Sequence, residues 1–225
     1  MLLTTLITRP LAVALLLAAR PASMAQDAPA PKVELPAPAR GGGMPLMQAL
    51  EGRRSTRGFA DRALPAEVLS NLLWAADGVN RPATGGRTAP SSYAKYPVDV
   101  YVVLPRGLYR YDPPGHRLVA VAGGDHRAEA GTEPHERVAP LNLVYVADLG
   151  RVGETPAPAS REDWLSWSAI EAGCIAQNVN LYCASEGLGA VVRVSVPQGE
   201  FRKAAGLRAD QVILLGQSVG HPASR

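Results

Sequence analysis

Two stretches near the start of the folded part of the chain carry apolar residues at helical spacing. In the segment 44–52 (MPLMQALEG), apolar residues stand at positions 44, 46, 47 and 50, which predicts a short amphipathic helix. A second helix is predicted after Pro65, because proline suits the first turn of a helix and an apolar stripe runs from Val68 to Ala76. Gly78 follows this stripe and is expected to end the helix.

The middle of the chain has short β-branched runs. Residues 98–104 (VDVYVVL) and 141–147 (LNLVYVA) predict two central strands, each apolar on both faces. Residues 107–112 and 116–121, which flank a Pro-Pro-Gly turn, predict a β-hairpin.

Two polar segments interrupt this pattern. Residues 80–92 are dense in Gly, Pro, Arg and Thr, which predicts a loop. Residues 121–140 have no apolar periodicity, and we expect them to be irregular and mobile.

The last third of the chain contains the longest predicted helix. Ser160 and Asp163 have the spacing of a capping box, and the helix is expected to end at Gly187. After it we predict a strand over 191–196, a short helix over 197–205 and a final strand over 211–220. Because helices and strands mix without a regular βαβ rhythm, we predict an α+β fold with a central, mostly antiparallel sheet flanked by helices.

Two N-terminal segments are expected to lie outside the folded domain. Residues 11–19 (LAVALLLAA) form an apolar run that is too short for a membrane span of roughly 20 residues, and Ser23-Met24-Ala25 fits a signal-peptidase site. We therefore predict a cleaved signal peptide over residues 1–25 and export, to the periplasm. Residues 26–43 (QDAPAPKVELPAPARGGG) predict a flexible tether, and residues 44–225 the domain.

Charge and cysteine content change this picture little. The formal net charge is +3, which does not predict a nucleic-acid-binding surface. Cys174 and Cys183 lie on the long predicted helix, roughly 13 Å apart by helical rise, which is beyond the reach of a disulfide. We expect two small buried thiols. The four histidines have no metal-ligand spacing, so no metal site is predicted.

The densest candidate chemistry lies in residues 52–58 (GRRSTRG). Phosphate prefers bidentate guanidinium groups, hydroxyl donors and free backbone N–H groups, and this segment offers all three. Its five candidate residues are Arg53, Arg54, Ser55, Thr56 and Arg57. Taken alone, the segment fits a solvated basic turn about equally well. The sequence has neither a P-loop nor a Rossmann glycine motif.

Five motifs in a fixed order resemble the nitroreductase family. They are the arginine motif at 53–59, Pro90-Ser91-Ser92, 171–178 (EAGCIAQN), 186–189 (EGLG) and 217–222 (QSVGHP). The strand and hairpin over 99–118 look more like the azoline-dehydrogenase-like branch than the cytosolic nitroreductases. The resemblance covers almost all of residues 44–222.

This resemblance implies an FMN held non-covalently at the interface of an intertwined homodimer. Arg53, Ser55 and Arg57 would hold the phosphate and the ribityl chain. The partner subunit would supply a ring-lining loop made of Pro90, Ser91 and Ser92. Val192, Arg193 and Val194 would pass along the flavin with a backbone N–H facing its N5 atom, and Arg225 would complete the phosphate site. One departure stands out: many family members have an asparagine where this chain has Ala94.

The activity implied is two-electron redox on a small organic substrate, by hydride transfer through flavin N5, with an unidentified electron donor or acceptor. An exported, non-catalytic flavin- or ligand-binding module on the same fold remains the alternative, with residues 121–140 as its recognition loop. Trp164 and Trp167 are expected to pack in the core or at a dimer contact rather than to stack on substrate. Lys95 and Tyr96 are interpreted as a strand entrance.

Overall fold

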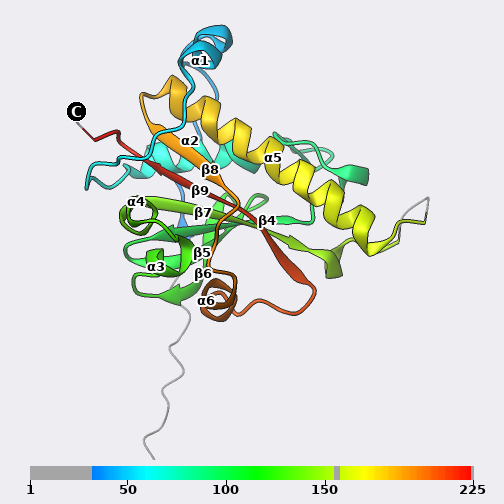
Figure 1. The fold of residues 1–225 in the computed structure, drawn as a ribbon. Coiled ribbons are helices and arrows are strands. Elements are labelled where there is room, and N and C mark those ends of the chain that lie inside the picture. Colours follow the sequence, from blue (N-terminus) through cyan, green and yellow to red (C-terminus); the bar gives the residue numbers. More distant parts are fainter. Residues whose placement is uncertain (1–31, 155–157, 224–225) are drawn as a thin grey trace, which may run out of the picture.

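A seven-stranded sheet with helices on both faces forms the body of the protein (Figure 1). The computed structural model describes residues 32–154 and 158–223. Its strand order is β1-β6-β5-β4-β7-β9-β8, and every neighbouring pair in it is antiparallel. The strands are β1 (Val33–Glu34), β4 (Val98–Leu104), β5 (Gly107–Asp112), β6 (Arg117–Gly123), β7 (Leu141–Asp148), β8 (Gly189–Arg193) and β9 (Gln211–Gly220). The predicted α+β architecture is confirmed.

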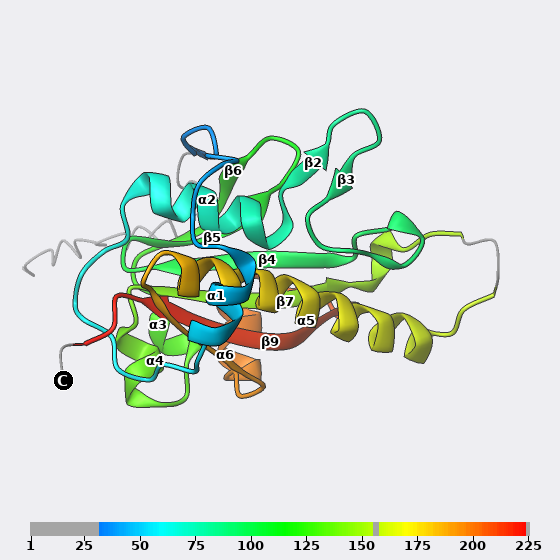
Figure 2. The ribbon, with the colours of Figure 1, turned by 90° about the horizontal axis from the view of Figure 1, so that it is seen from above.

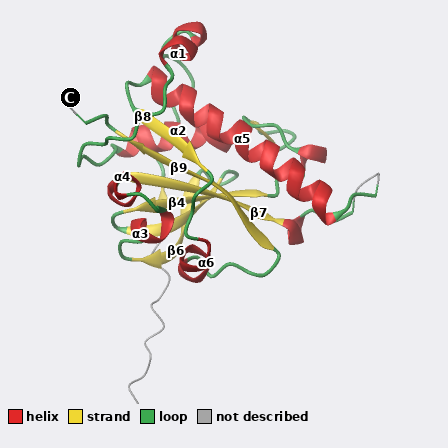
Figure 3. Ribbon diagram, in the orientation of Figure 1, coloured by secondary structure: helices red, strands yellow, loops and turns green. Residues whose placement is uncertain are grey.

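The helices lie in two groups, one on each face of the sheet (Figure 3). They are α1 (Leu46–Gly52), α2 (Ala66–Asp77), α3 (Arg127–Ala130), α4 (Pro134–Val138), α5 (Arg161–Ser185) and α6 (Gln198–Ala204). Seen from above in Figure 2, α5 runs across the sheet with α1 beside it, and α2 lies on the same face. Two strands, β2 (Val79–Arg81) and β3 (Gly86–Arg87), form a separate small ribbon, and η1 (Ser92–Ala94) and η2 (Leu149–Arg151) are short 3-10 turns.

Side chains of the central strands pack into two hydrophobic cores, one on each face of the sheet. In β4, Val100 and Val102 pack in the cluster that includes α2 and α5, while Tyr101 and Val103 pack in the cluster on the other face. There the ring of Tyr101 meets Phe201 of α6 edge to face, with centroids 5.8 Å apart. Because successive side chains of a strand point to opposite faces, an unbroken apolar run is what a strand covered on both sides requires.

The long helix α5 begins and ends as predicted. The backbone N–H of Asp163 donates to Ser160 Oγ at 3.0 Å, and the N–H of Ser160 donates to Asp163 Oδ2 at 2.9 Å, so the capping box is formed. Gly187, with a φ of +68°, follows the helix in the left-handed conformation that glycine adopts without strain.

Part of the predicted tether is ordered. Val33 and Glu34 pair with Leu118 and Arg117 at the edge of β6, and the Ser70 hydroxyl donates to Pro36 O at 2.6 Å. The prediction of a structureless tether is therefore wrong for residues 32–43. The unpaired backbone groups of an edge strand bind an added segment through its main chain, which needs no apolar periodicity. The predicted signal peptide, residues 1–25, and residues 26–31 lie outside the described residues.

Segment 121–140 also differs from expectation, because it contains the end of β6 and the helices α3 and α4. Glu136 explains the order: its carboxylate accepts the N–H groups of Thr132 at 2.7 Å and Glu133 at 3.0 Å. Such local side-chain contacts leave no periodic signal in the sequence. In segment 80–92, predicted to be a loop, the β2–β3 ribbon and the start of η1 form.

Glu136 also ties this segment to the edge of the sheet. Its carboxylate lies 3.3 Å from Nε of Arg193, the last residue of β8, and both side chains are buried. The Arg193 guanidinium also donates to Asn142 Oδ1 of β7 at 3.0 Å. Burial alone would raise the pKa of Glu136, but hydrogen bonds from backbone N–H groups and the nearby Arg193 charge hold that pKa below its usual value of 4.5.

We predict that Glu136→Gln lowers the free energy of unfolding by about 3 kcal/mol at neutral pH, because Arg193 loses its buried counter-charge. Chemical denaturation measures the difference. Since the folded-state pKa of Glu136 is depressed, its stabilisation is present above pH 4.5 and is lost as the pH falls further, so wild type and variant should converge in acid. Glu154→Gln, at an exposed position, is the control. Equal stability of E136Q and wild type at neutral pH would contradict the role given to the pair.

Candidate functional site

The arginine-rich segment is fastened along the outer strand of the sheet. Ser55 forms a parallel bridge with Ala190 of β8, and the N–H of Thr56 donates to Ala190 O at 2.9 Å. Beyond β9, the N–H of Ala60 donates to His221 O at 2.9 Å and the N–H of Ala223 donates to Gly58 O at 3.0 Å. The segment is therefore held by main-chain contacts at both ends, and its side chains are free for other partners.

The arginines of this segment stand without counter-charges. Arg54, Ser55 and Arg57 are exposed, and Arg53 and Thr56 are half-buried. Among the described residues, no carboxylate lies within ion-pair distance of Arg53, Arg54 or Arg57. A cavity of about 110 Å³ is lined by Arg53, Arg54 and Thr56 together with the end of α5 and the start of β8. Uncompensated guanidinium groups beside a hydroxyl make a donor set that fits a phosphate.

The continuation of β8 offers backbone rather than side-chain groups. β8 is the last strand in the sheet order, so its outer edge beyond Ala190 has no strand partner among the described residues. Val192 packs against the core and Val194 is 79% exposed, whereas the Arg193 side chain is buried toward Glu136. Of the three residues predicted to follow the cofactor, Arg193 can therefore contribute only its main chain.

Pro90, Ser91 and Ser92 lie elsewhere, over the N-terminal half of α5. They line a cavity of about 250 Å³ with four residues of that helix: Trp167, Ile170, Glu171 and Cys174. The N–H of Tyr96 donates to Ser91 Oγ at 2.8 Å and fixes this loop. Tyr93 and Ala94 follow with φ of +53° and +52°, in the left-handed region.

Trp167, which lines this cavity, belongs to a small aromatic cluster. The exposed ring of Tyr93 lies with its centroid 5.8 Å from that of Trp167, and Trp167 meets the buried Trp164 at 5.1 Å. Trp164 packs in the interior, as expected. Trp167 packs against Trp164 and also lines the cavity.

Glu171 supplies a carboxyl group to the lining of this cavity. The residue is 3% exposed, and its Oε1 atom is buried with no hydrogen-bond partner among the described residues. Burial raises the pKa of Glu171 to about 7, against the lowering effect of a hydrogen bond from Ser91. Glu171 is the first residue of the motif 171–178, but the sequence alone predicts no role for it. The sequence does contain a signal for a buried carboxyl group, because this glutamate stands in the stripe of the helix in which Ala172, Ile175 and Val179 are buried.

Within one chain, the arginine segment and the Pro90–Ser91–Ser92 loop do not come together. Glu171 and Cys183 line the two different cavities from the same helix, which places them about 18 Å apart along its axis. The arginine cavity and the Pro90–Ser91–Ser92 cavity are therefore separate within a single chain. Arg225, predicted to complete the phosphate site, lies outside the described residues.

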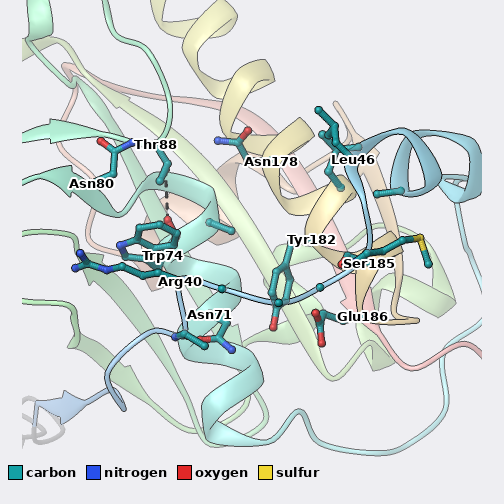
Figure 4. Close-up of a pocket in the computed structure, with 18 residues that line it drawn as sticks. Arg40, Leu46, Asn71, Trp74, Asn80, Thr88, Asn178, Tyr182, Ser185 and Glu186 are labelled. Carbon is teal, nitrogen blue, oxygen red and sulfur yellow. Dashed lines mark hydrogen bonds between the residues drawn. The ribbon is translucent and has the colours of Figure 1, made fainter.

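A third cavity, of about 490 Å³, lies between residues 39–44, α1, α2 and α5 (Figure 4). The Arg40 guanidinium lies 5.5 Å from the ring centroid of Trp74, and the Thr88 hydroxyl donates to Trp74 O at 3.3 Å. Figure 4 shows Tyr182 and Asn178 of α5 at its opposite wall. None of the residues predicted for the cofactor site lines this cavity.

The remaining predictions concern cysteines and the membrane. Cys174 and Cys183 are free thiols, as predicted, although Cys174 is only half-buried. In the described ranges, 32–154 and 158–223, no helix is both long and apolar enough to span a bilayer.

Sequence comparison places these motifs in a family context. A family model described as the nitroreductase family matches residues 50–221. A protein of Methanocaldococcus jannaschii assigned as a nitroreductase is 28% identical over 180 residues, which cover 76% of this chain and 88% of that protein.

Solved structures show the same fold. A Ralstonia eutropha JMP134 protein assigned as a nitroreductase is 46% identical, with a TM-score of 0.79, over 86% of this chain and 90% of its own. Nitroreductase A from Vibrio parahaemolyticus, at 23% identity and a TM-score of 0.60, covers 80% of this chain and 69% of its own. A chain of the Escherichia coli microcin synthetase complex, at 21% identity and a TM-score of 0.64, covers 74% and 68%. The last two similarities concern the fold alone.

We predict that Gly189→Ala destabilises the protein by about 1–3 kcal/mol, because the added Cβ overpacks the contact between β8 and the arginine segment. That atom would lie 2.6 Å from Cγ2 of Thr56, whose backbone is fixed by Ala190. Thermal or chemical unfolding measures the loss. Gly199→Ala in α6, where the new Cβ meets nothing within 4 Å, is the matched control. If both variants unfold like wild type, the segment does not pack tightly on β8.

Proposed function

Because this chain belongs to the nitroreductase family, we propose that it is an FMN-dependent oxidoreductase acting on a small organic substrate. The observation that carries the proposal is the row of uncompensated arginines fastened to the outer edge of β8. A protein gains no stability from placing Arg53, Arg54 and Arg57 side by side without carboxylates, since like charges repel. An anionic ligand at this position offsets the repulsion.

The arginine segment and β8 supply groups that fit two parts of an FMN molecule. Arg53, Ser55 and Arg57 hold the phosphate and the ribityl chain by charge-assisted hydrogen bonds. The outer edge of β8 offers backbone groups to the isoalloxazine ring, and the exposed Val194 offers it an apolar contact. When bound, FMN supplies two-electron chemistry through hydride transfer at N5, which no amino-acid side chain provides.

A homodimer completes the site in this proposal. The Pro90–Ser91–Ser92 loop lies too far along α5 to reach the arginine cavity of its own chain, so a second copy provides it. The exposed side of α5 supports this arrangement, because it presents small and apolar residues: Ala169, Ile170 and Gly173. Ile170 is 64% exposed, and Met47 of α1 is 74% exposed. These exposed apolar side chains fit a subunit interface, where a second copy would cover them.

The proposal includes export. The segment 1–25 reads as a cleavable signal, so the mature chain begins at Gln26 and works in the periplasm.

Outside the cytosol an organic donor, a quinone or a membrane partner replaces NAD(P)H as redox partner. The hairpin of β5 and β6 supports kinship with the azoline-dehydrogenase-like branch. Mass spectrometry of the secreted protein tests the cleavage site.

We predict that the purified mature protein carries FMN, visible as flavin absorbance and released by heat. Arg53→Ala or Arg57→Ala is expected to weaken FMN binding roughly 10- to 100-fold, because each removes a charge-assisted contact worth about 1.5–3 kcal/mol. Fluorescence titration of the apoprotein with FMN measures the affinities. Arg106→Ala, at an exposed arginine outside the segment, should bind like wild type.

Two outcomes would count against this function. A colourless protein that stays colourless with added FMN would leave the arginines to another anion and favour the non-catalytic binding module. An equal loss of affinity in R53A and R106A would show that general charge, rather than this segment, attracts the cofactor.

A further inference from the structure

Glu171 is a carboxyl group with a free oxygen at the wall of a cavity. It projects from α5 beneath the Pro90–Ser91–Ser92 loop, and its Oε1 atom is sealed from solvent with no hydrogen-bond partner among the described residues. A buried polar atom without a partner costs free energy, and a charged one costs more than a neutral one. Packing alone would favour an apolar residue here, since the neighbouring buried positions of the helix hold Ala172 and Ile175.

Ser91 lines the same cavity as this carboxyl group and donates a hydrogen bond that lowers the pKa of Glu171. Its Oγ atom accepts the N–H of Tyr96 at 2.8 Å, so the hydroxyl proton remains to be donated elsewhere. Toward an ionised Glu171 the hydroxyl donates. When Glu171 is protonated, the Ser91 oxygen can accept a hydrogen bond from the carboxyl group. The Ser91 hydroxyl can then donate its proton to a ligand in the cavity. A serine with one fixed acceptor contact can thus pass a proton between a carboxyl group and a ligand.

The surrounding charges set the range in which Glu171 exchanges protons. Burial has the largest effect on the pKa of Glu171 and raises it, and Asp77 at the end of α2 raises it too. Hydrogen bonds from Ser91 and the backbone of Val98, and the charge of Arg87 in β3, lower the pKa, and the net value is about 7. Cys174 lies one turn further along α5 and Tyr96 lies beside Ser91. The pKa of Asp77 is itself raised by burial, to about 6. Two carboxyl groups near this cavity therefore titrate close to neutral pH, and only Glu171 lines it.

We propose that Glu171, acting through Ser91, is the proton-exchanging residue for the substrate bound against this loop. The proposal rests on the proposed function, which places the loop beside the partner subunit's cofactor. For a quinone substrate, two electrons and one proton come from reduced FMN, which is thereby oxidised. The second proton leaves the Glu171 carboxyl for Ser91 Oγ as Ser91 gives its own proton to the quinol oxygen. Glu171 is left as a carboxylate, and water returns its proton.

The first test is the pH profile of quinone reduction. With dithionite-reduced holoenzyme and a water-soluble benzoquinone, single-turnover reoxidation should slow as the pH rises through about 7, because the carboxyl group must be protonated to act. Glu171→Gln should lower the rate roughly 10²- to 10⁴-fold and remove that pH dependence. Glu171→Asp should restore part of the rate. Glu162→Gln, on the exposed first turn of α5, should behave like wild type.

The second test needs no turnover. The midpoint potential of the bound flavin should change slope with pH near 7 in wild type, and E171Q should lose this break while still binding FMN. Asp77→Asn should keep the break but move it to lower pH, because a charge that raises the pKa of Glu171 is gone. A break that persists unchanged in E171Q, or an unchanged pH profile, would overturn the proposal.

A third measurement covers the case in which E171Q does not fold. The infrared spectrum of the unmodified holoenzyme should show a protonated carboxyl band that disappears as the pH rises through about 7, and that changes when the flavin is reduced. No such band would overturn the role of Glu171 while leaving FMN binding intact. A protein that binds no FMN would instead overturn the proposed function and this inference with it.

Discussion

The stiffness of α5 is the constraint on which the arrangement of this protein depends. The helix has 25 residues, is capped at Ser160 and ends before Gly187, and its buried residues run from Trp164 to Cys183. A helix rises about 1.5 Å per residue and does not fold back, so groups placed near its two ends stay apart. Both cavities that contain predicted site residues use α5 as a wall, one near each end. The helix therefore fixes the distance between them.

The outer edge of β8 presents the opposite problem, because an uncovered strand edge invites unwanted pairing. Three features secure it. The arginine segment covers the start of β8 through its bridge to Ala190, and β9 pairs with the inner edge of β8. At the end of β8, the Arg193 side chain contacts Glu136 and Asn142 and holds the strand in place. What remains open is a short stretch of backbone beside three arginines. Positive charge deters the addition of another basic edge and attracts an anionic ligand in its place.

Elements that depend on periodicity could be predicted from the sequence, and those that depend on single contacts could not. The apolar runs of β4 and β7 and the capping box of α5 are local signals, and the structure forms each of them. The strand at Val33 arises from a partner far along the chain, Leu118, which no window of neighbouring residues contains. The helix at Glu136 depends on contacts of its carboxylate with neighbouring backbone N–H groups, which leave no apolar period, and its ion pair with the distant Arg193 has no signal in the sequence.

The same distinction applies to the candidate site: residues that are neighbours in the sequence could be predicted, and residues brought together by folding could not. The arginine segment was visible because its chemistry is concentrated in five consecutive residues, whereas Glu171 is one acidic residue in an apolar stripe. Its meaning depends on Ser91, which folding brings to it from 80 positions earlier. The inward turn of the Arg193 side chain was equally invisible, since it depends on Glu136.

In the proposed dimer, the separation fixed by α5 becomes useful. A two-fold axis perpendicular to α5 at its exposed face would place the two copies of the helix antiparallel, so the loop end of one would meet the arginine end of the other. Each chain then contributes the arginines to one site and Ser91 with Glu171 to the second. Anion binding and proton exchange are kept apart in the monomer, where the free Glu171 oxygen has no partner among the described residues. A rigid helix thus explains why two sites would form together and neither would form in a single chain.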